Sequence, residues 1–219
     1  MSGVPGPWDL FADVATPDPR PGDEVAEILV VCTGNICRSP LAMALLEHAA
    51  RDRLGSDAPV WVRSSGVHAM QGHPASEESG RQARLRGLDL QSHRGALTTR
   101  DELASADLVL VMSEQHRIKV VAMHAPAARW TFTLPEFARL CAALKPIGDD
   151  SVSPRERIRF VVRLAHGSRA YVPRPGGPEE VADPYGGPRG GYETMATEVD
   201  GHVRRIAPQL FGWRPTDGQ

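Results

Sequence analysis

The chain has 219 residues, of which 24% are charged, and its formal net charge at pH 7 is -2. These values fit one globular domain of ordinary size with extensions, and nothing in them indicates a nucleic-acid partner. Because the sequence has no apolar run of roughly 18 residues and no signal peptide, we expect a cytoplasmic protein without a membrane segment. Three cysteines are too few for a disulfide scaffold, and the 23 arginines against 2 lysines are typical of a bacterial source.

The predicted elements alternate between strands and helices. The proline-rich segment 1–22 is predicted to be a flexible extension, followed by a single domain over 23–212 and a tail over 213–219. The predicted strands are 27–32, 60–64, 107–112 and 130–134, and the first predicted helices are 40–53, 77–86 and 114–125. This alternation predicts an α/β fold, a three-layer sandwich with a central four-stranded parallel sheet, whose ligands bind at the carboxyl ends of the strands.

An insertion is predicted at about residues 135–180, with helical patterns at 136–144 and 154–166. The segment 173–191, with five prolines and six glycines, is typical of a long loop, and its length favours a lid. The last helix is predicted over 192–210. This loop carries the late acidic residue Asp183.

The first predicted strand runs directly into Cys32-Thr-Gly-Asn-Ile-Cys-Arg-Ser-Pro40. A loop that turns its backbone N–H groups inward and leads into a helix forms a cradle for an anion. Gly34 and Asn35 tolerate the left-handed backbone that such a tight loop requires. Ser39 followed by proline is a typical helix start, with Ser39 as the cap. The sequence therefore predicts a phosphate-binding loop whose electric field favours the thiolate form of Cys32.

The stretch 31–40 resembles, almost position by position, the N-terminal signature of the low-molecular-weight protein tyrosine phosphatases. The distant tripeptide Asp183-Pro184-Tyr185 resembles the second motif of that family. The resemblance covers about residues 26–134 and 181–212, and departs from the family's pattern at the insertion.

This resemblance implies protein-tyrosine phosphatase activity through a cysteinyl-phosphate intermediate, without a cofactor and without a metal ion. Cys32 is the implied nucleophile, and Arg38 is expected to bind two phosphoryl oxygens through its planar fork. Asp183 is the implied general acid, which then serves as the general base. The implied partner is a phosphotyrosine-containing protein such as a bacterial tyrosine kinase, and the oligomeric state stays open.

Further residues receive supporting roles from the same resemblance. The expected phosphate-binding and supporting positions in the loop are Thr33, Gly34, Asn35, Ile36, Cys37 and Ser39. The side chain of Asn35 is expected to bond to Ser39, Ser64 or His93, while Met70 and Tyr185 are expected to line the substrate cleft. Ser39 has two interpretations, a donor to the Cys32 sulfur or a helix cap, which are compatible. Cys37 either forms a reversible disulfide with Cys32 or fills space in the core.

Other functions use a similar loop. Protein arginine phosphatases resemble this chain there but typically carry threonine at the position of Ile36, which favours phosphotyrosine. Thioredoxin-linked arsenate reductases need two further cysteines close together, whereas this chain has only the isolated Cys141. A regulatory protein that binds phosphate groups without catalysis is the alternative from a different class. The joint presence of Cys32, Arg38, Ser39 and Asp183 argues against it.

Overall fold

The computed structural model describes residues 25–145, 147 and 152–213. Four strands form one parallel sheet in the order β2-β1-β3-β4. The strands are β1 (Ala26–Cys32), β2 (Val60–Gly66), β3 (Leu108–Val111) and β4 (Thr131–Thr133). The helices are α1 (Arg38–Leu54), α2 (Glu77–Arg84), α3 (Arg100–Ser105), α4 (Glu114–Met123), α5 (Leu134–Ala143), α6 (Pro154–Ser168) and α7 (Arg189–Phe211), with a 3-10 helix η2 (Ala125–Arg129) between α4 and β4.

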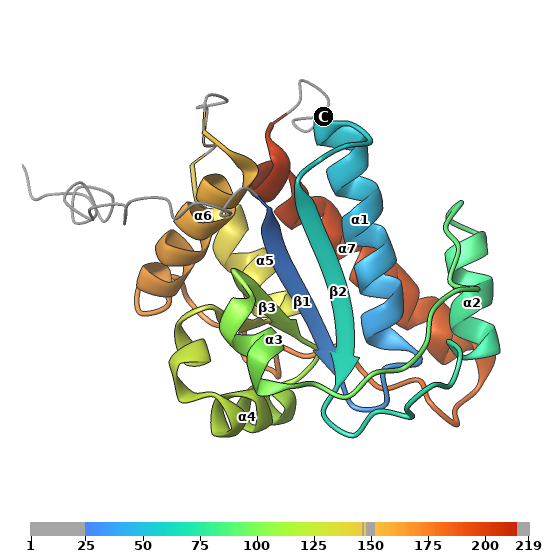
Figure 1. The fold of residues 1–219 in the computed structure, drawn as a ribbon. Coiled ribbons are helices and arrows are strands. Elements are labelled where there is room, and N and C mark those ends of the chain that lie inside the picture. The colour runs from blue at the N-terminus through green and yellow to red at the C-terminus, as the bar shows by residue number, and fades with distance from the viewer. Residues whose placement is uncertain (1–24, 146, 148–151, 214–219) are drawn as a thin grey trace, which may run out of the picture.

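The sheet is covered on both faces (Figure 1). In β1 the side chains of Ile28 and Val30 pack into a core shared with α1, α5, α6 and α7, whereas Leu29 and Val31 pack against α3, α4 and η2. A strand buried on both faces is a continuous apolar run, as expected for the centre of a parallel sheet. The predicted α/β sandwich with a four-stranded parallel sheet is confirmed.

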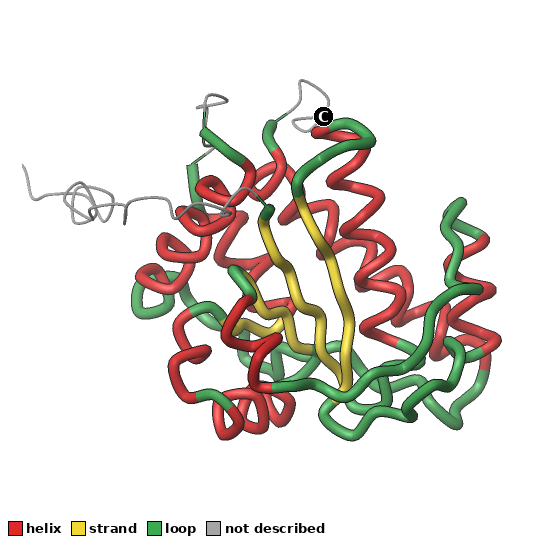
Figure 2. The backbone as a smooth tube through the Cα atoms, in the orientation of Figure 1, coloured by secondary structure: helices red, strands yellow, loops and turns green. Residues whose placement is uncertain are grey.

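The strand order brings the loops after β1, β2 and β3 to one edge of the sheet. Figure 2 shows these loops gathered where the strands end. The long loop between α6 and α7 reaches the same edge, because the Val181 N–H donates to the Met112 carbonyl just beyond β3, at 2.8 Å. Asp183 therefore approaches the end of β1 although it lies about 150 residues away in the sequence.

Most predicted elements occur within a few residues of their expected bounds, but the start of α1 differs. The helix begins at Arg38, with Cys37 at the N-cap position and no side-chain cap. The prediction of Ser39 as the helix cap is therefore wrong, because its hydroxyl contacts the Cys32 sulfur instead of a backbone N–H. The short α3 and η2 were not predicted, and α7 begins three residues before its expected start.

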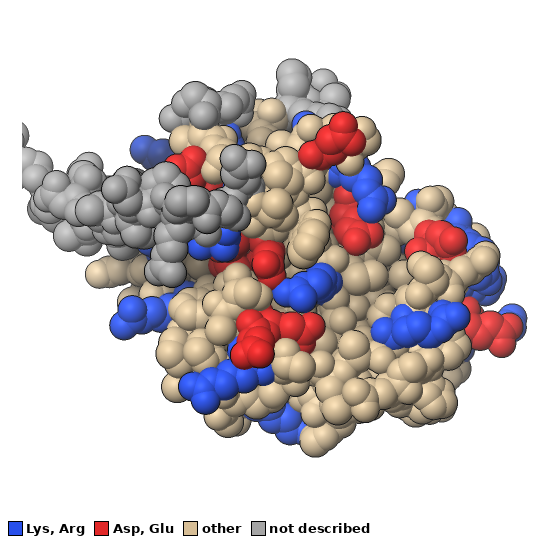
Figure 3. Space-filling model, viewed as in Figure 1, with Lys and Arg blue, Asp and Glu red and all other residues tan. Residues whose placement is uncertain are grey.

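The expected extension over 1–22 lies outside the described residues, as does the expected tail apart from Trp213. The range predicted as an insertion contains α5 and α6, and Ile158 and Val161 of α6 belong to the main core. Among the described helices, none combines the length and the hydropathy that a membrane span needs. Acidic and basic side chains are intermixed over the face drawn in Figure 3, in keeping with the small net charge.

Candidate active site

Cys32 is the last residue of β1 and Arg38 is the first residue of α1, so the loop between them joins a buried strand to a helix N-terminus. Asn35 adopts a φ of 55°, the only positive φ of a non-glycine residue in the described chain. The N–H groups of Gly34, Ile36 and Cys37 donate no hydrogen bond to the main chain in this part of the structure. The loop thus has the unpaired amides and the helix end that bind an anion.

The Cys32 sulfur lies among hydrogen-bond donors. The Asn35 N–H donates to it at 3.3 Å, and the Ser39 hydroxyl lies at 3.0 Å. Because Ser39 Oγ accepts from the Asn35 side-chain amide at 2.9 Å, its own hydrogen is available for the sulfur, which is closer than the Ser65 carbonyl at 3.4 Å. Donors to a sulfur stabilise its anionic form, so this environment suits a nucleophile.

Hydrogen bonds of the Asn35 side chain and backbone stabilise the strained turn. Its amide donates to Ser39 and to Ser64, the latter at 3.0 Å, and its side-chain oxygen accepts from the Ala96 N–H at 2.9 Å. The Asn35 carbonyl lies 2.7 Å from Nε2 of His93, which must donate because a carbonyl only accepts. Burial lowers the pKa of His93, which favours the neutral ring. The predicted side-chain contacts of Asn35 with Ser39 and Ser64 are present, whereas His93 contacts its backbone carbonyl and not its side chain.

Arg38 and Asp183 meet in the cleft. Nη2 of Arg38 lies 2.5 Å from Oδ2 of Asp183, and Nη1 donates to the Val181 carbonyl at 3.3 Å. The Arg38 side chain is 6% exposed, whereas that of Asp183 is 47% exposed. Within the described residues the Nε–H of Arg38 is buried and has no hydrogen-bond partner, which leaves this guanidinium with donor capacity for an oxyanion.

The cleft has a volume of about 180 Å³ and is lined by Cys32, Thr33, Gly34, Ile36, Cys37, Arg38, His68, Met70, Asp183 and Tyr185. Met70 and Tyr185 are exposed and line this cleft, as predicted from the sequence. The Cys37 sulfur instead points to Ser76 at 3.3 Å, and burial raises the pKa of this thiol. Its disulfide with Cys32 stays a prediction, since both cysteines are free thiols here.

The sequence did not predict one series of hydrogen-bonded side chains at this site. The ring of His116 on α4 lies between Ser113, the N-cap of that helix, and Thr33 of the loop. The spacing Ser113-x-x-His116 is an ordinary helix start, so the only signal was its position directly after a predicted strand. His68 also lines the cleft and lies 2.9 Å from the Lys119 ammonium, although the sequence predicted no role for it.

Comparisons with known proteins agree with this geometry. The family described as "Low molecular weight phosphotyrosine protein phosphatase" matches residues 27–142. The chain is 32% identical over 150 residues to the probable low molecular weight protein-tyrosine-phosphatase EpsP of Ralstonia nicotianae, covering 68% of this chain and 96% of that protein. It is 29% identical over 183 residues to a protein-arginine-phosphatase of Geobacillus stearothermophilus, covering 84% of this chain and 95% of that protein. The crystal structure of the Erwinia amylovora tyrosine phosphatase AmsI superposes with a TM-score of 0.61 at 25% identity, covering 85% of this chain and 93% of that one.

Proposed function

Because the chain belongs to the low-molecular-weight protein tyrosine phosphatase family, we propose that it hydrolyses phosphotyrosine in proteins through a cysteinyl-phosphate intermediate. The observation that carries this proposal is the meeting of Cys32, Arg38 and Asp183 in one cleft. A loop that only binds phosphate needs the amides and the arginine, but it needs neither a sulfur supplied with donors nor a carboxylic acid beside it.

In the first step the Cys32 sulfur attacks phosphorus, and the bond from phosphorus to the phenolic oxygen breaks. The loop amides and Arg38 stabilise the charge on the three equatorial oxygens. Asp183 gives its proton to the departing oxygen. Arg38 is paired with Asp183 in this structure, so the incoming phosphoryl group must replace the carboxylate at the guanidinium, which frees Asp183 to turn toward the leaving group.

In the second step Asp183 removes a proton from a water molecule as that water attacks the phosphorus of the cysteinyl phosphate. The bond from phosphorus to sulfur breaks, and the sulfur leaves as a thiolate. Ser39 stabilises that thiolate from 3.0 Å. A thiol nucleophile that must stay reduced supports a cytoplasmic location.

The walls of the cleft support an aromatic substrate. The Tyr185 ring, 60% exposed, and Met70, 36% exposed, offer apolar contact to a phenyl ring at the mouth. Hydrolysis of phosphoarginine is the second candidate, because the similarity to a protein-arginine-phosphatase extends over 84% of the chain. Ile36, an apolar side chain in the wall, favours the phenyl ring over a polar guanidinium. The proposed partner is a phosphotyrosine protein such as a bacterial tyrosine kinase.

Hydrolysis of p-nitrophenyl phosphate by purified protein tests the proposal. We expect the wild type to be active and Cys32→Ser to be inactive. Cys141→Ala is the matched control, because the Cys141 thiol is fully buried in the core and burial raises its pKa. Activity that survives in Cys32→Ser, or that disappears in Cys141→Ala while that variant stays folded, contradicts the proposal.

A comparison of peptides distinguishes the two substrate classes. The same peptide sequence carrying phosphotyrosine or phosphoarginine should give a larger kcat/KM for phosphotyrosine. Ile36→Thr should shift this ratio toward phosphoarginine, because it removes the apolar wall beside the substrate. A ratio that favours phosphoarginine in the wild type assigns the chain to the second candidate function.

A further inference from the structure

A hydrogen-bonded chain connects the end of β3 to the first residue of the phosphate-binding loop. Nδ1 of His116 lies 2.7 Å from the Ser113 hydroxyl oxygen, and Nε2 lies 2.8 Å from the Thr33 hydroxyl oxygen. His116 and Ser113 are buried, at 5% and 9% exposed, whereas Thr33 is half-buried and lines the cleft. This series of hydrogen bonds therefore ends at the Thr33 hydroxyl group, which borders the proposed binding place of a phosphoryl group.

The His116 ring is neutral at physiological pH. Burial, the Arg38 guanidinium and the Lys119 ammonium lower its pKa to about 4, and the Asp183 carboxylate opposes them only in part. A neutral imidazole carries one N–H, so one ring nitrogen donates and the other accepts. The position of that single hydrogen decides which way the two hydroxyl groups point.

The single ring hydrogen lies either on Nδ1 or on Nε2. Each position leaves a different hydroxyl hydrogen without an acceptor. If Nδ1 carries the hydrogen, the Ser113 oxygen accepts from the ring as well as from the His116 backbone N–H, which is 3.4 Å away. The buried Ser113 O–H then has no other acceptor among the described residues, which is unfavourable. If Nε2 carries the hydrogen, Ser113 donates to Nδ1, and Nε2 donates to the Thr33 oxygen. The hydrogen left over is then that of Thr33, at the cleft.

We propose that His116 holds its hydrogen on Nε2 and thereby orients the Thr33 hydroxyl to donate to an oxygen of the bound phosphoryl group. Thr33 is thus a binding residue through its side chain, beyond the loop amides, and His116 is a positioning residue that acts through it. The inference rests on the proposed function for the identity of the ligand, a tetrahedral oxyanion. The Thr33 hydroxyl thus gives the phosphoryl group one further, uncharged hydrogen-bond donor, in addition to Arg38 and the loop amides.

Titration calorimetry with inorganic phosphate tests the Thr33 hydroxyl without any turnover. Thr33→Val keeps the shape of the side chain and removes the hydroxyl, whereas Thr33→Ser is the matched control that keeps it. We expect Thr33→Val to weaken phosphate binding by roughly tenfold and to lower kcat/KM for p-nitrophenyl phosphate by a similar factor. Thr33→Ser should stay within roughly threefold of the wild type. Equal binding by Thr33→Val and the wild type, or equal losses in both variants, overturns the assignment.

Two measurements test His116. Nitrogen-15 NMR of the ring should show a protonated Nε2 and an unprotonated Nδ1 at pH 7, and the opposite pattern overturns the inference. His116→Phe should weaken phosphate binding in the wild-type background but have little further effect in Thr33→Val, because the two residues act through one hydroxyl. Fully additive losses contradict a positioning role. A wild type that binds phosphate but hydrolyses no phosphomonoester refutes the proposed function, while these binding comparisons still decide the inference.

Discussion

Gly66, the last residue of β2, lies directly beneath the phosphate-binding loop. A Cβ atom at this position would stand 2.4 Å from the Thr33 carbonyl oxygen and 3.0 Å from the Asn35 nitrogen. Both neighbours are backbone atoms of the loop, so neither can move aside without displacing the amides that we propose bind the phosphoryl group. The loop therefore requires glycine at position 66 because a larger residue has no space there. The φ angle of Gly66 is not in the left-handed region, so backbone conformation is not the reason.

We predict that Gly66→Ala lowers kcat/KM by roughly tenfold to a hundredfold, because a displacement of about 1 Å in a catalytic site costs up to that factor. Steady-state assays with p-nitrophenyl phosphate measure this effect. Gly201→Ala is the control, since Gly201 lies in α7 with nothing within 4 Å of an added Cβ, and alanine favours the helix there. A fully active Gly66→Ala enzyme would show that the loop tolerates the shift.

The sequence predicted the residues of the site best where a motif fixes both residue type and spacing. Cys32, Arg38 and Asn35 lie in one short loop, and the predicted contacts of Ser39 with the Cys32 sulfur and with the Asn35 side chain are present. His116 could not be found in this way, because its role depends on the strand order, which brings the end of β3 beside the end of β1. A lone histidine in a short helix gives no local sign of such a contact.

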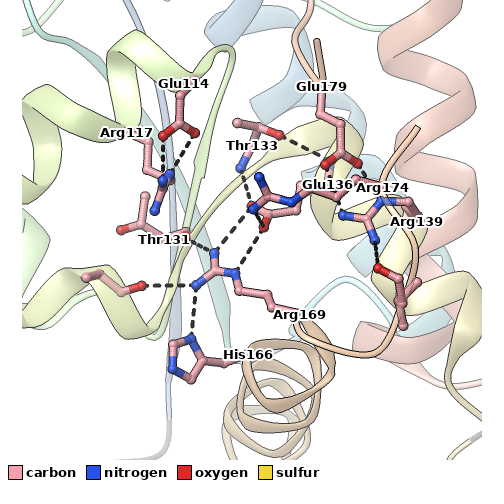
Figure 4. A network of polar contacts seen from close by, with 12 residues as sticks. Glu114, Arg117, Thr131, Thr133, Glu136, Arg139, His166, Arg169, Arg174 and Glu179 are labelled. Carbon is pink, nitrogen blue, oxygen red and sulfur yellow. Dashed lines mark hydrogen bonds and ion pairs between the residues drawn. The ribbon is translucent and has the colours of Figure 1, made fainter. Parts of the chain in front are cut away.

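At the scale of elements, α5 anchors the loop that carries Asp183. Arg139 of α5 forms a two-pronged ion pair with Glu179, with distances of 2.5 and 2.9 Å, and also donates to the Val172 carbonyl at 3.1 Å. Figure 4 shows this pair beside a second one, in which Arg169 at the end of α6 contacts Glu136 of α5. The end of α6 and the loop that follows it are thereby attached to α5.

Arg139→Met should let the loop that carries Asp183 move and so impair the acid and base steps proposed for Asp183. We predict that kcat falls by roughly threefold to tenfold for phenyl phosphate, a poor leaving group that needs the acid, and less for p-nitrophenyl phosphate. Arg204→Met is the control, because it breaks an exposed ion pair with Asp200 in α7, far from this loop in sequence. Equal effects on both substrates would indicate that Arg139 does not act through Asp183.

Most elements, including the short strands, were predicted close to their observed bounds, whereas α3 and η2 were not predicted. The six residues of α3 are too few for an apolar period, although Thr99 and Glu102 form a capping box that signals its start. The start of α1 was misplaced because Ser39-Pro40 has the composition of a helix cap. In the structure the Ser39 hydroxyl contacts the Cys32 sulfur and does not cap the helix.

At the scale of the whole molecule, two histidines couple folding to pH. Burial, with neighbouring cations, lowers the pKa of both His116 and His202 to about 4. The unfolded chain binds these two protons below about pH 6.5, whereas the folded chain binds them only near pH 4. The folded state therefore loses stability as the pH falls through this window.

We predict that the free energy of unfolding drops by about 2 kcal/mol for each of these histidines between pH 7 and pH 5, as an upper estimate. Urea denaturation at a series of pH values measures this slope. His202→Gln, on α7 and away from the cleft, should remove its share of the slope and leave the activity intact. The same slope in the variant as in the wild type would contradict the coupling through His202.

The most direct test of the account is to find the phosphoryl group on the enzyme. Asp183→Ala should still accept the phosphoryl group from p-nitrophenyl phosphate, whose leaving group needs little acid, but should hydrolyse the intermediate slowly because the base is missing. Mass spectrometry of this variant, denatured at neutral pH during turnover, should show one added phosphoryl group on the peptide that contains Cys32. An intermediate on another residue, or steady hydrolysis with Cys32 never modified, would contradict the nucleophilic role of this cysteine.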